Sequence, residues 1–408
     1  MSLKRICFYV LSMVIAVPQL MAQSTVSDTH ISDSLSDKPI HHLGIDFHAG
    51  YIAAKKKFFH GDNAKNEPIN KAISGQIRYS FQFPSDTRWG RMYPNTYQGI
   101  GLSYNTFFNK EELGNPIGIF IFQGSRIAEL SPTLSFDYEW NFGASFGWKP
   151  MNKDENSPEY NPNNTAIGTK VNAYINIALM LNWKIGDEWR FKAGIDYMHF
   201  SNGTTHYPNA GVNAIGARIG LIRILNPEIA RLPRHKDHTL DIEPHMSYDV
   251  VVYGTARFRD IKFGDETYHA KGPYAVWGFN FNPMYNINKL FKVGGSLDAQ
   301  YDRSANLKEY VIDAEAEEKV FGRPPFQKQF GIGLSARMEL VMPIFSVNLG
   351  VGHNIIYQGE DTKGFYQIFA LKASVTKDFF LHIGYRLQDF RAPNNLMLGV
   401  GYRFHNKR

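Results

Sequence analysis

The sequence predicts an all-β protein, a transmembrane antiparallel β-barrel of the outer membrane with about 14–16 strands. Three observations lead there. Apolar and polar residues alternate with a period of two along many segments, the chain begins like a secreted protein, and 14% of its residues are aromatic, with 30 Phe and 22 Tyr. The polar faces carry charged residues in mid-strand, which suits a wet or ion-paired lumen better than a soluble β-sandwich.

The N-terminus reads as a secretory signal. Lys4 and Arg5 precede a short apolar run over 6–17, and a small residue, Ala22, follows shortly after it. This pattern predicts a signal peptide over 1–22 that is cleaved after Ala22. The alternative, an uncleaved anchor, needs roughly 20 apolar residues, and the run is shorter.

The mature chain is expected to begin with a flexible leader over 23–41, which is rich in Ser, Asp and His. Cys7 is the only cysteine and leaves with the signal, so neither a disulfide nor thiol chemistry is expected. Loss of the two basic residues of the signal leaves 42 basic against 38 acidic residues, which lowers the formal charge from +6 to +4. That charge is too small to indicate a nucleic-acid partner.

The alternation defines each strand in turn. In the second strand, for example, Ile77, Tyr79 and Phe81 face one way, and Arg78 and Ser80 face the other. The pattern predicts strands over 43–54, 73–83, 98–108, 117–125, 132–148, 170–184, 188–201, 213–225, 245–259, 274–286, 292–302, 328–341, 344–357, 366–377, 380–389 and 395–404.

Long polar connections alternate with tight ones for much of the chain. Bacterial barrels place tight turns in the periplasm and long loops outside, so the strand over 188–201 is expected to end at the extracellular side. Two connections, 84–97 and 226–244, are long where a short turn is expected, and the second is a candidate join between two units. We therefore expect a first unit over 42–226 and further barrel strands over 227–408.

Charged residues on the polar faces are expected to pair inside the barrel. The candidate cations are Arg78, Arg190, Lys192, Arg218, Arg337 and Arg386, and the candidate acids are Asp137, Glu139, Asp196, Asp298 and Glu339.

A candidate site lies at the end of the strand over 188–201. His199 and Ser201 share the apolar face of that strand with Tyr197 and Ile195. A base beside a hydroxyl on an apolar face is a poor way to build a core, but it suits attack on an ester buried in lipid. The structural alternative is a pair of interfacial residues that touch lipid headgroups.

The residues around this pair resemble the outer-membrane lipid A 3-O-deacylases of the PagL type. In that family a strand ends in His-x-Ser-Asn, a short loop rich in Pro, Asn and Gly follows, and the next strand opens with the acid of the triad. The resemblance covers about 43–226. Over this wider stretch the chain is similar to the longer members of that family, the acyloxyacyl hydrolases. It is carried by the segments 196–213, 97–102, 113–116 and 146–150.

This resemblance implies His199 as general base, Ser201 as nucleophile, and Asn202 and Gly203 as the place of the oxyanion donors. The Glu of the family's catalytic triad falls on Asn213. Outer-membrane phospholipase A, an unrelated barrel whose site resembles this one in spacing, uses Asn as the third residue of its triad. An amide oxygen can accept the Nδ1–H of the histidine and fix its tautomer, although it stabilises imidazolium less than a carboxylate does. Asp196, the acid nearest in sequence, lies on the lumen face and is not expected to take part.

The sequence thus predicts a carboxylic ester hydrolase in the outer membrane of a Gram-negative bacterium. Its expected substrate is an ester-linked acyl chain of lipid A in lipopolysaccharide, removed by a Ser-His-Asn mechanism on the lipid-facing wall. Phospholipid is the rival substrate, and a non-catalytic porin or structural barrel is the rival function. No cofactor and no metal are expected. The expected partner is the membrane itself, and a second copy of the chain in a homodimer is a candidate partner.

Overall fold

The structure, a computed structural model, describes residues 38–54, 56–84, 87–203, 205–231, 243–263, 266–313, 319–389 and 392–406. The predicted signal peptide and residues 23–37 of the predicted leader lie outside this part of the chain. The last two residues of the predicted leader belong to a strand, because the first strand begins at Ile40. No helix within the described ranges has the length and apolar character needed to span a membrane.

The first eight strands form a closed antiparallel barrel, because β8 pairs back with β1 in a register that sets Ile45 opposite Leu221. The strands are β1 (Ile40–Ile52), β2 (Lys71–Gln82), β3 (Tyr97–Thr106), β4 (Gly114–Ser131), β5 (Leu134–Trp148), β6 (Val171–Ile185), β7 (Trp189–Ser201) and β8 (Val212–Ile224). The other elements of this half are η1 (Lys57–His60), α2 (Arg88–Met92) and α3 (Pro227–Ala230).

The remaining barrel strands close a second ring, in which β9 pairs with both β10 and β18. The strands are β9 (His245–Phe263), β10 (Glu266–Asn286), β11 (Phe291–Asp302), β14 (Phe330–Val341), β15 (Phe345–Ile356), β16 (Phe365–Ser374), β17 (Phe379–Gln388) and β18 (Ala392–His405). The small elements are η2 (Leu307–Tyr310), the hairpin of β12 (Val311–Asp313) and β13 (Val320–Phe321), α4 (Phe326–Gln329) and η3 (Glu360–Thr362).

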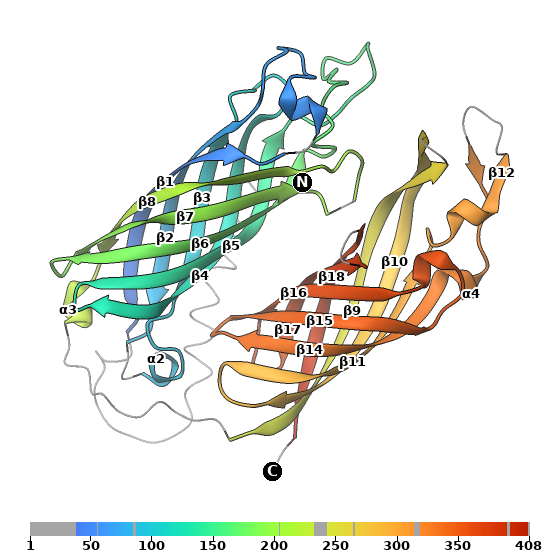
Figure 1. Cartoon of the computed structure of the whole chain (residues 1–408). Helices are drawn as coiled ribbons and strands as arrows, with labels where there is room; N and C mark the ends of the chain where they lie inside the picture. The colour runs from blue at the N-terminus through green and yellow to red at the C-terminus, as the bar shows by residue number, and fades with distance from the viewer. Residues whose placement is uncertain are drawn as a thin grey trace.

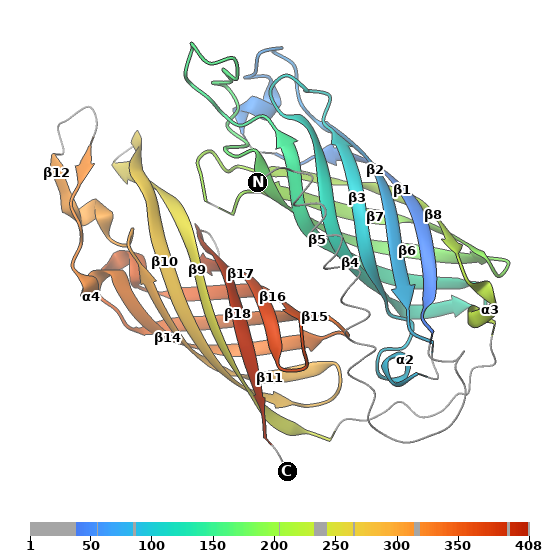
Figure 2. The ribbon, with the colours of Figure 1, turned by 180° about the vertical axis from the view of Figure 1, so that it is seen from behind.

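The predicted fold class is confirmed, since the described chain is all-β with antiparallel strands in closed barrels. The expectation of one barrel wall is corrected, because the strands close as two rings of eight. The two barrels lie side by side in both ribbon views (Figure 1, Figure 2). Eight strands make a barrel whose interior side chains can fill, whereas a single larger ring would leave a wide lumen.

The two barrels have the same loop polarity. In each, the longest connection, over 149–170 in the first barrel and 303–329 in the second, leaves from one end, which we call the long-loop end, and the opposite end is the short-turn end. At the short-turn end of the first barrel, the long connection between β2 and β3 contains α2. The chain between β8 and β9 also leaves from that end.

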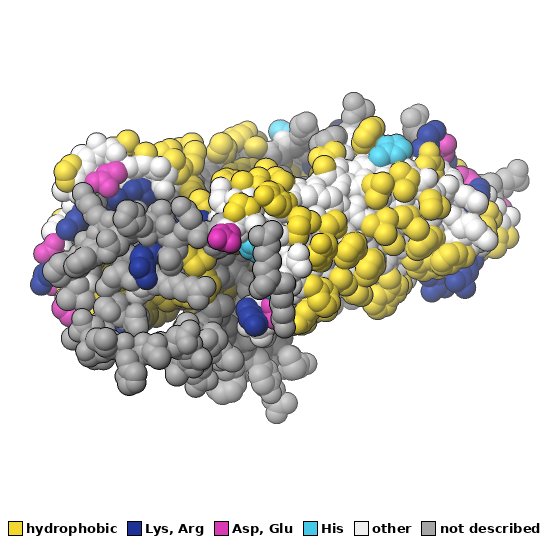
Figure 3. Space-filling view, turned by 90° about the horizontal axis from the view of Figure 1, so that it is seen from below, with side chains coloured by type: hydrophobic (Ala, Val, Ile, Leu, Met, Phe, Trp, Pro, Cys, Tyr) yellow, Lys and Arg dark blue, Asp and Glu magenta, His cyan; other side chains and the backbone are white. Residues whose placement is uncertain are grey.

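Side chains alternate between the lumen and the outer face along strands of the first barrel such as β1, β2 and β6. In β1, Ile45 is 60% exposed and points outward with Leu43 and Phe47, while Asp46 and His48 are buried in the lumen. Hydrophobic side chains accordingly cover much of the outer surface in the view of Figure 3. A lipid-facing apolar wall around a polar interior is the pattern of an outer-membrane barrel.

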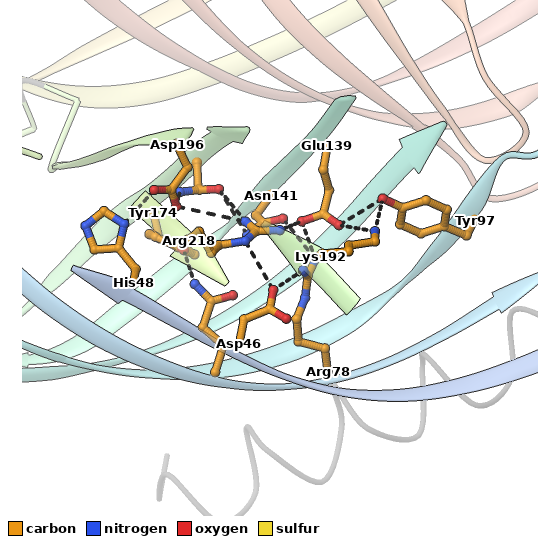
Figure 4. Close-up of polar contacts among 12 residues, drawn as sticks. Asp46, His48, Arg78, Tyr97, Glu139, Asn141, Tyr174, Lys192, Asp196 and Arg218 are labelled. Atoms are coloured by element: carbon orange, nitrogen blue, oxygen red, sulfur yellow. Dashed lines mark hydrogen bonds and ion pairs between the residues drawn. The ribbon is translucent and has the colours of Figure 1, made fainter. Parts of the chain in front are cut away.

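The lumen of the first barrel is filled by a buried ion-pair network (Figure 4). Arg78 contacts Asp46 at 2.5 Å and Glu139 at 2.6 Å, and Arg218 contacts the same two carboxylates. The ammonium of Lys192 lies 3.6 Å from Glu139. Each of these five buried charges therefore meets an opposite charge, as burial in a low-dielectric interior requires.

The second barrel is filled in the same way by residues of different strands. Lys372 contacts Asp249 at 2.8 Å and Glu339 at 2.5 Å, and Arg403 also contacts both acids. The predicted pairing of lumen cations with lumen acids is confirmed for the main pairs, which are Arg78–Glu139, Lys192–Glu139, Arg218–Glu139 and Arg337–Asp298.

Candidate active site

The end of β7 is held in place by an aromatic cluster inside the first barrel. Phe200 points into the lumen and is fully buried, with its ring centroid 5.1 Å from Tyr174, 5.2 Å from Trp148 and 5.9 Å from Phe107. Because side chains alternate along a strand, an anchored Phe200 forces the residues before and after it to the outer face. This packing fixes the backbone that carries the candidate pair.

The structure brings the three predicted catalytic side chains together on that outer face. The Nε2 atom of His199 lies 2.8 Å from the Oγ of Ser201, and its Nδ1 atom lies 2.6 Å from the Oδ1 of Asn213. His199 and Asn213 are register partners across β7 and β8, which explains the short approach. The three side chains are partly buried and form one continuous hydrogen-bonded line.

A fourth side chain, Tyr197, contacts the same line. Its hydroxyl donates to the Oδ1 of Asn213 at 2.7 Å, so this oxygen faces both Tyr197 and His199. An amide oxygen only accepts, which assigns the imidazole proton to Nδ1 and leaves Nε2 to accept from the serine hydroxyl. Sequence reasoning missed this role, although Tyr197 precedes His199 by two residues on the same face and was open to the same argument.

The loop between β7 and β8 is tied down by its own side chains. The backbone N–H of Asn202 donates to the Oδ1 of Asn209 at 2.9 Å, and the Asn202 amide donates to the carbonyl of His206 at 2.8 Å. The Asn202 N–H, one of the expected oxyanion donors, is therefore engaged within the loop. Gly203 follows in the left-handed region with φ +63°, two residues after the serine.

Gly211, near the end of the same loop, packs against the candidate pair. Its φ is +71°, and a Cβ built on it would lie 3.5 Å from the imidazole of His199 and 2.7 Å from the carbonyl oxygen of Phe200. The loop therefore needs glycine here, both for the backbone conformation and for the close approach. The sequence showed Gly211 only as part of a turn-rich loop.

Asp196 takes no part in this site, as expected. Its carboxylate is buried in the lumen, where it contacts Nδ1 of His48 at 2.5 Å and accepts from Asn176 at 2.7 Å (Figure 4). The barrel wall separates it from Ser201. Asn213 is thus the group that the structure sets against the second ring nitrogen of His199.

Other polar sites on the described chain offer less chemistry. A cavity of about 460 Å³ lies at the short-turn end of the first barrel, and none of the candidate catalytic residues lines it. Within the described ranges, no group of three or more His, Cys, Asp or Glu side chains is placed to hold a metal ion. The outer wall at Ser201 is therefore the best candidate for catalysis.

Comparison with known proteins places the chain in a family. The family model for lipid A 3-O-deacylase (PagL) matches residues 74–221, and the model for the acyloxyacyl hydrolase C-terminal domain matches residues 246–406. None of the curated proteins compared with the chain matches it. The first match falls within the first barrel, and the second spans almost the whole of the second barrel.

Solved structures with some similarity include three outer-membrane proteins. Neisserial surface protein A is 8% identical, with 46% of this chain and 97% of that chain covered and a TM-score of 0.30. The outer membrane protein Ail of Yersinia pestis is 20% identical (39% and 99% covered, TM-score 0.23), and the siderophore receptor PirA of Pseudomonas aeruginosa is 7% identical (90% and 81% covered, TM-score 0.25). These scores are low, so the fold rests on the strand pairing of the chain itself. Because the two family models together cover most of both barrels, the chain belongs to the PagL-type family of outer-membrane lipid A 3-O-deacylases and acyloxyacyl hydrolases.

Proposed function

We propose that the chain hydrolyses an ester-linked acyl chain of lipid A, with Ser201 as nucleophile, His199 as general acid and base, and Asn213 as the residue that orients His199. The observation that carries the proposal is the hydrogen-bonded line from Ser201 Oγ through both imidazole nitrogens to Asn213 Oδ1. Serine is a weak nucleophile at neutral pH, and a base within hydrogen-bond reach is what activates it.

In the proposed first half-reaction, Ser201 Oγ attacks the ester carbonyl carbon while its proton passes to His199 Nε2. The tetrahedral intermediate then collapses, the bond between the carbonyl carbon and the ester oxygen breaks, and the imidazolium gives its proton to the leaving alkoxide. In the second half-reaction, water loses a proton to His199 and attacks the acyl-serine. The free fatty acid leaves and the serine is restored.

The oxyanion of this intermediate needs hydrogen-bond donors beside Ser201. We assign this role to the backbone of the turn that directly follows Ser201 and contains Gly203, as the family resemblance implies. The positive φ of Gly203 turns the chain sharply just after the nucleophile. Exclusion of water by lipid strengthens such contacts.

The place of the site favours lipid A over phospholipid. Ser201 is the last residue of β7 and lies at the long-loop end, which in bacterial barrels faces the cell exterior. Lipid A occupies the outer leaflet at that depth, and an outward-facing serine meets it directly from the bilayer. A porin function has less support, because ion pairs fill the described lumen of each barrel.

We further propose a division of the chain in which residues 42–226 carry the chemistry and residues 227–408 supply a second barrel beside it. Homodimerisation stays a prediction. Size-exclusion chromatography with light scattering in detergent measures it.

The test is mass spectrometry of lipid A from cells that express the wild-type chain or Ser201→Ala. We expect the wild type to remove one ester-linked acyl chain and Ser201→Ala to remove none, with both proteins folded in the outer membrane. Unchanged lipid A together with a rise in lysophospholipid would move the activity to phospholipid. Loss of the acyl chain in the Ser201→Ala strain would refute the assigned nucleophile.

A further inference from the structure

The second barrel reaches the first at the candidate active site. The ring of His206, in the β7–β8 loop, lies 4.8 Å from the ring of Phe258 in β9. A Cβ built on Gly203 would lie 3.6 Å from Leu396 Cδ1 in β18 and 3.7 Å from Tyr385 Cε2 in β17. Three strands of the second barrel therefore contact the loop that follows Ser201.

A charge interaction supports the same arrangement. Partial burial raises the pKa of the Tyr207 phenol, and the carboxylate of Asp260 in β9 raises it further. Tyr207 belongs to the β7–β8 loop and Asp260 to the second barrel, so the two elements are close enough to interact electrostatically.

The second-barrel residues at this contact point outward and are largely apolar. In β17 and β18 the neighbours of Tyr385 and Leu396, such as Arg386 and Met397, are buried in the lumen, so Tyr385 and Leu396 themselves face the membrane side. Both are only partly exposed, whereas Leu398, the next outward residue of β18, is 47% exposed. The first barrel therefore covers this outer face of β17 and β18 at the long-loop end.

The barrels also touch near their short-turn ends. The ring of Trp140 in β5 lies 5.6 Å from that of Phe345, and the hydroxyl of Tyr138 lies 3.8 Å from the sulfur of Met342. Ile177, the register partner of Trp140 in β6, remains 54% exposed. Contacts at both ends hold the second barrel against the wall that carries the site, while apolar side chains between the ends stay available to lipid.

The outer face of the first barrel beside the nucleophile carries small side chains, and we call this part of it the low wall. Ala173 of β6 is the register partner of Ser201, and Ala144 of β5 is the partner of Ala173. These small side chains let an extended hydrocarbon chain lie against the barrel next to the serine. Larger residues, Phe142 and Ile175, occupy the next outward row toward the short-turn end.

We propose that Phe258, Tyr385 and Leu396 form the second wall of the acyl-chain site and determine the length of the chain that is removed. The inference deepens the proposed function and rests on it. An acyl chain attached at Ser201 is held between the low wall of the first barrel and these three side chains. The alternative environment of the chain is lipid and not water, so this contact selects the length of the chain through packing and shape.

The test uses Leu396→Trp in the full-length chain, with Leu334→Trp as its matched control. Leu334 is also an outward leucine at the fifth position of its strand and is 52% exposed, but β14 lies on the opposite side of the second ring from β18. Both variants and the wild type are assayed on lipid A substrates that differ only in the length of the ester-linked chain. Neither leucine belongs to the proposed catalytic line.

We expect Leu396→Trp to lower the ratio of kcat/KM for long over short chains by about tenfold, and Leu334→Trp to leave it at the wild-type value. An unchanged ratio in Leu396→Trp would overturn the second wall while leaving the proposed function intact. Absence of deacylation in the wild type, with folded protein, would instead remove the proposed function.

A cross-link tests the arrangement without using activity. Cys7 is the only native cysteine and lies in the predicted signal, so the double variant His206→Cys/Phe258→Cys carries one reporter pair. We expect oxidation to join the pair in outer-membrane vesicles and the single variants to stay unlinked. Failure of the folded double variant to cross-link would refute the contact, and with it the second wall.

Discussion

Replacing Asn213 by Asp tests how the site activates its base. The substitution keeps the shape of the side chain and exchanges an amide oxygen for a carboxylate oxygen 2.6 Å from the Nδ1 of His199. A hydrogen bond to a charged group contributes about 1.5–3 kcal/mol, compared with about 0.5–1.5 kcal/mol for a neutral one. The imidazolium forms only as the reaction proceeds, so the difference of about 1.3 kcal/mol between the midpoints of these ranges appears in the barrier.

We therefore expect kcat of Asn213→Asp to rise about tenfold with KM nearly unchanged. Asn213→Leu removes the acceptor and leaves the Nδ1–H of His199 without its partner, so its kcat is expected to fall by at least about tenfold. Release of fatty acid from lipid A in mixed micelles measures both. The reasoning is refuted if the leucine variant keeps wild-type kcat, because Asn213 then does not orient His199.

Three further substitutions probe the supports of the site. Tyr197→Phe deletes the second donor to Asn213 Oδ1, so kcat should fall about fivefold, which corresponds to a barrier about 1 kcal/mol higher. The midpoint of unfolding in denaturant should stay the same. An equal loss of transition-state and folding free energy would mean that Tyr197 acts only on stability. Gly211→Ala places a Cβ 2.7 Å from the carbonyl of Phe200 at φ +71°, at a cost of about 1–2 kcal/mol, and should lower kcat with the barrel still folded by circular dichroism; full activity would contradict the close packing. Glu139→Gln removes the negative charge that pairs with Arg78 and Arg218, so the folded state should lose about 3 kcal/mol of stability. In gel electrophoresis after heating, the band of the folded barrel should disappear at a lower temperature than in the wild type, with kcat unchanged below that temperature. Unaltered heat resistance would show that the network is dispensable.

The strands of both barrels could be read from the sequence because side-chain alternation is a local property. The strand expected over 188–201 is β7 (Trp189–Ser201), and the one expected over 213–225 is β8 (Val212–Ile224). Ring closure could not be read in this way. Whether β8 returns to β1 depends on pairs such as Ile45 with Leu221, which are distant in sequence and carry no local signal.

The pair of His199 and Ser201 was predictable for the same reason, since strand periodicity places both side chains on one face, whereas Asn213 as the third residue of the line followed from the family resemblance. The loop geometry was not. The Asn202 N–H was expected at the oxyanion, but it donates to Asn209, because the loop satisfies its backbone groups through its own turns. The inward aromatic cluster was also missed, since Phe200 lies on the face expected to be polar.

The covalent join between the barrels has a consequence for how activity depends on surface density. Residues 225–244 tether the second ring to the first, so every molecule that reaches the membrane carries its neighbour in fixed one-to-one proportion. An enzyme completed by a separate subunit loses specific activity when it becomes sparse. Here we expect turnover per molecule to stay constant as expression falls, which suits a protein present in few copies among abundant lipid.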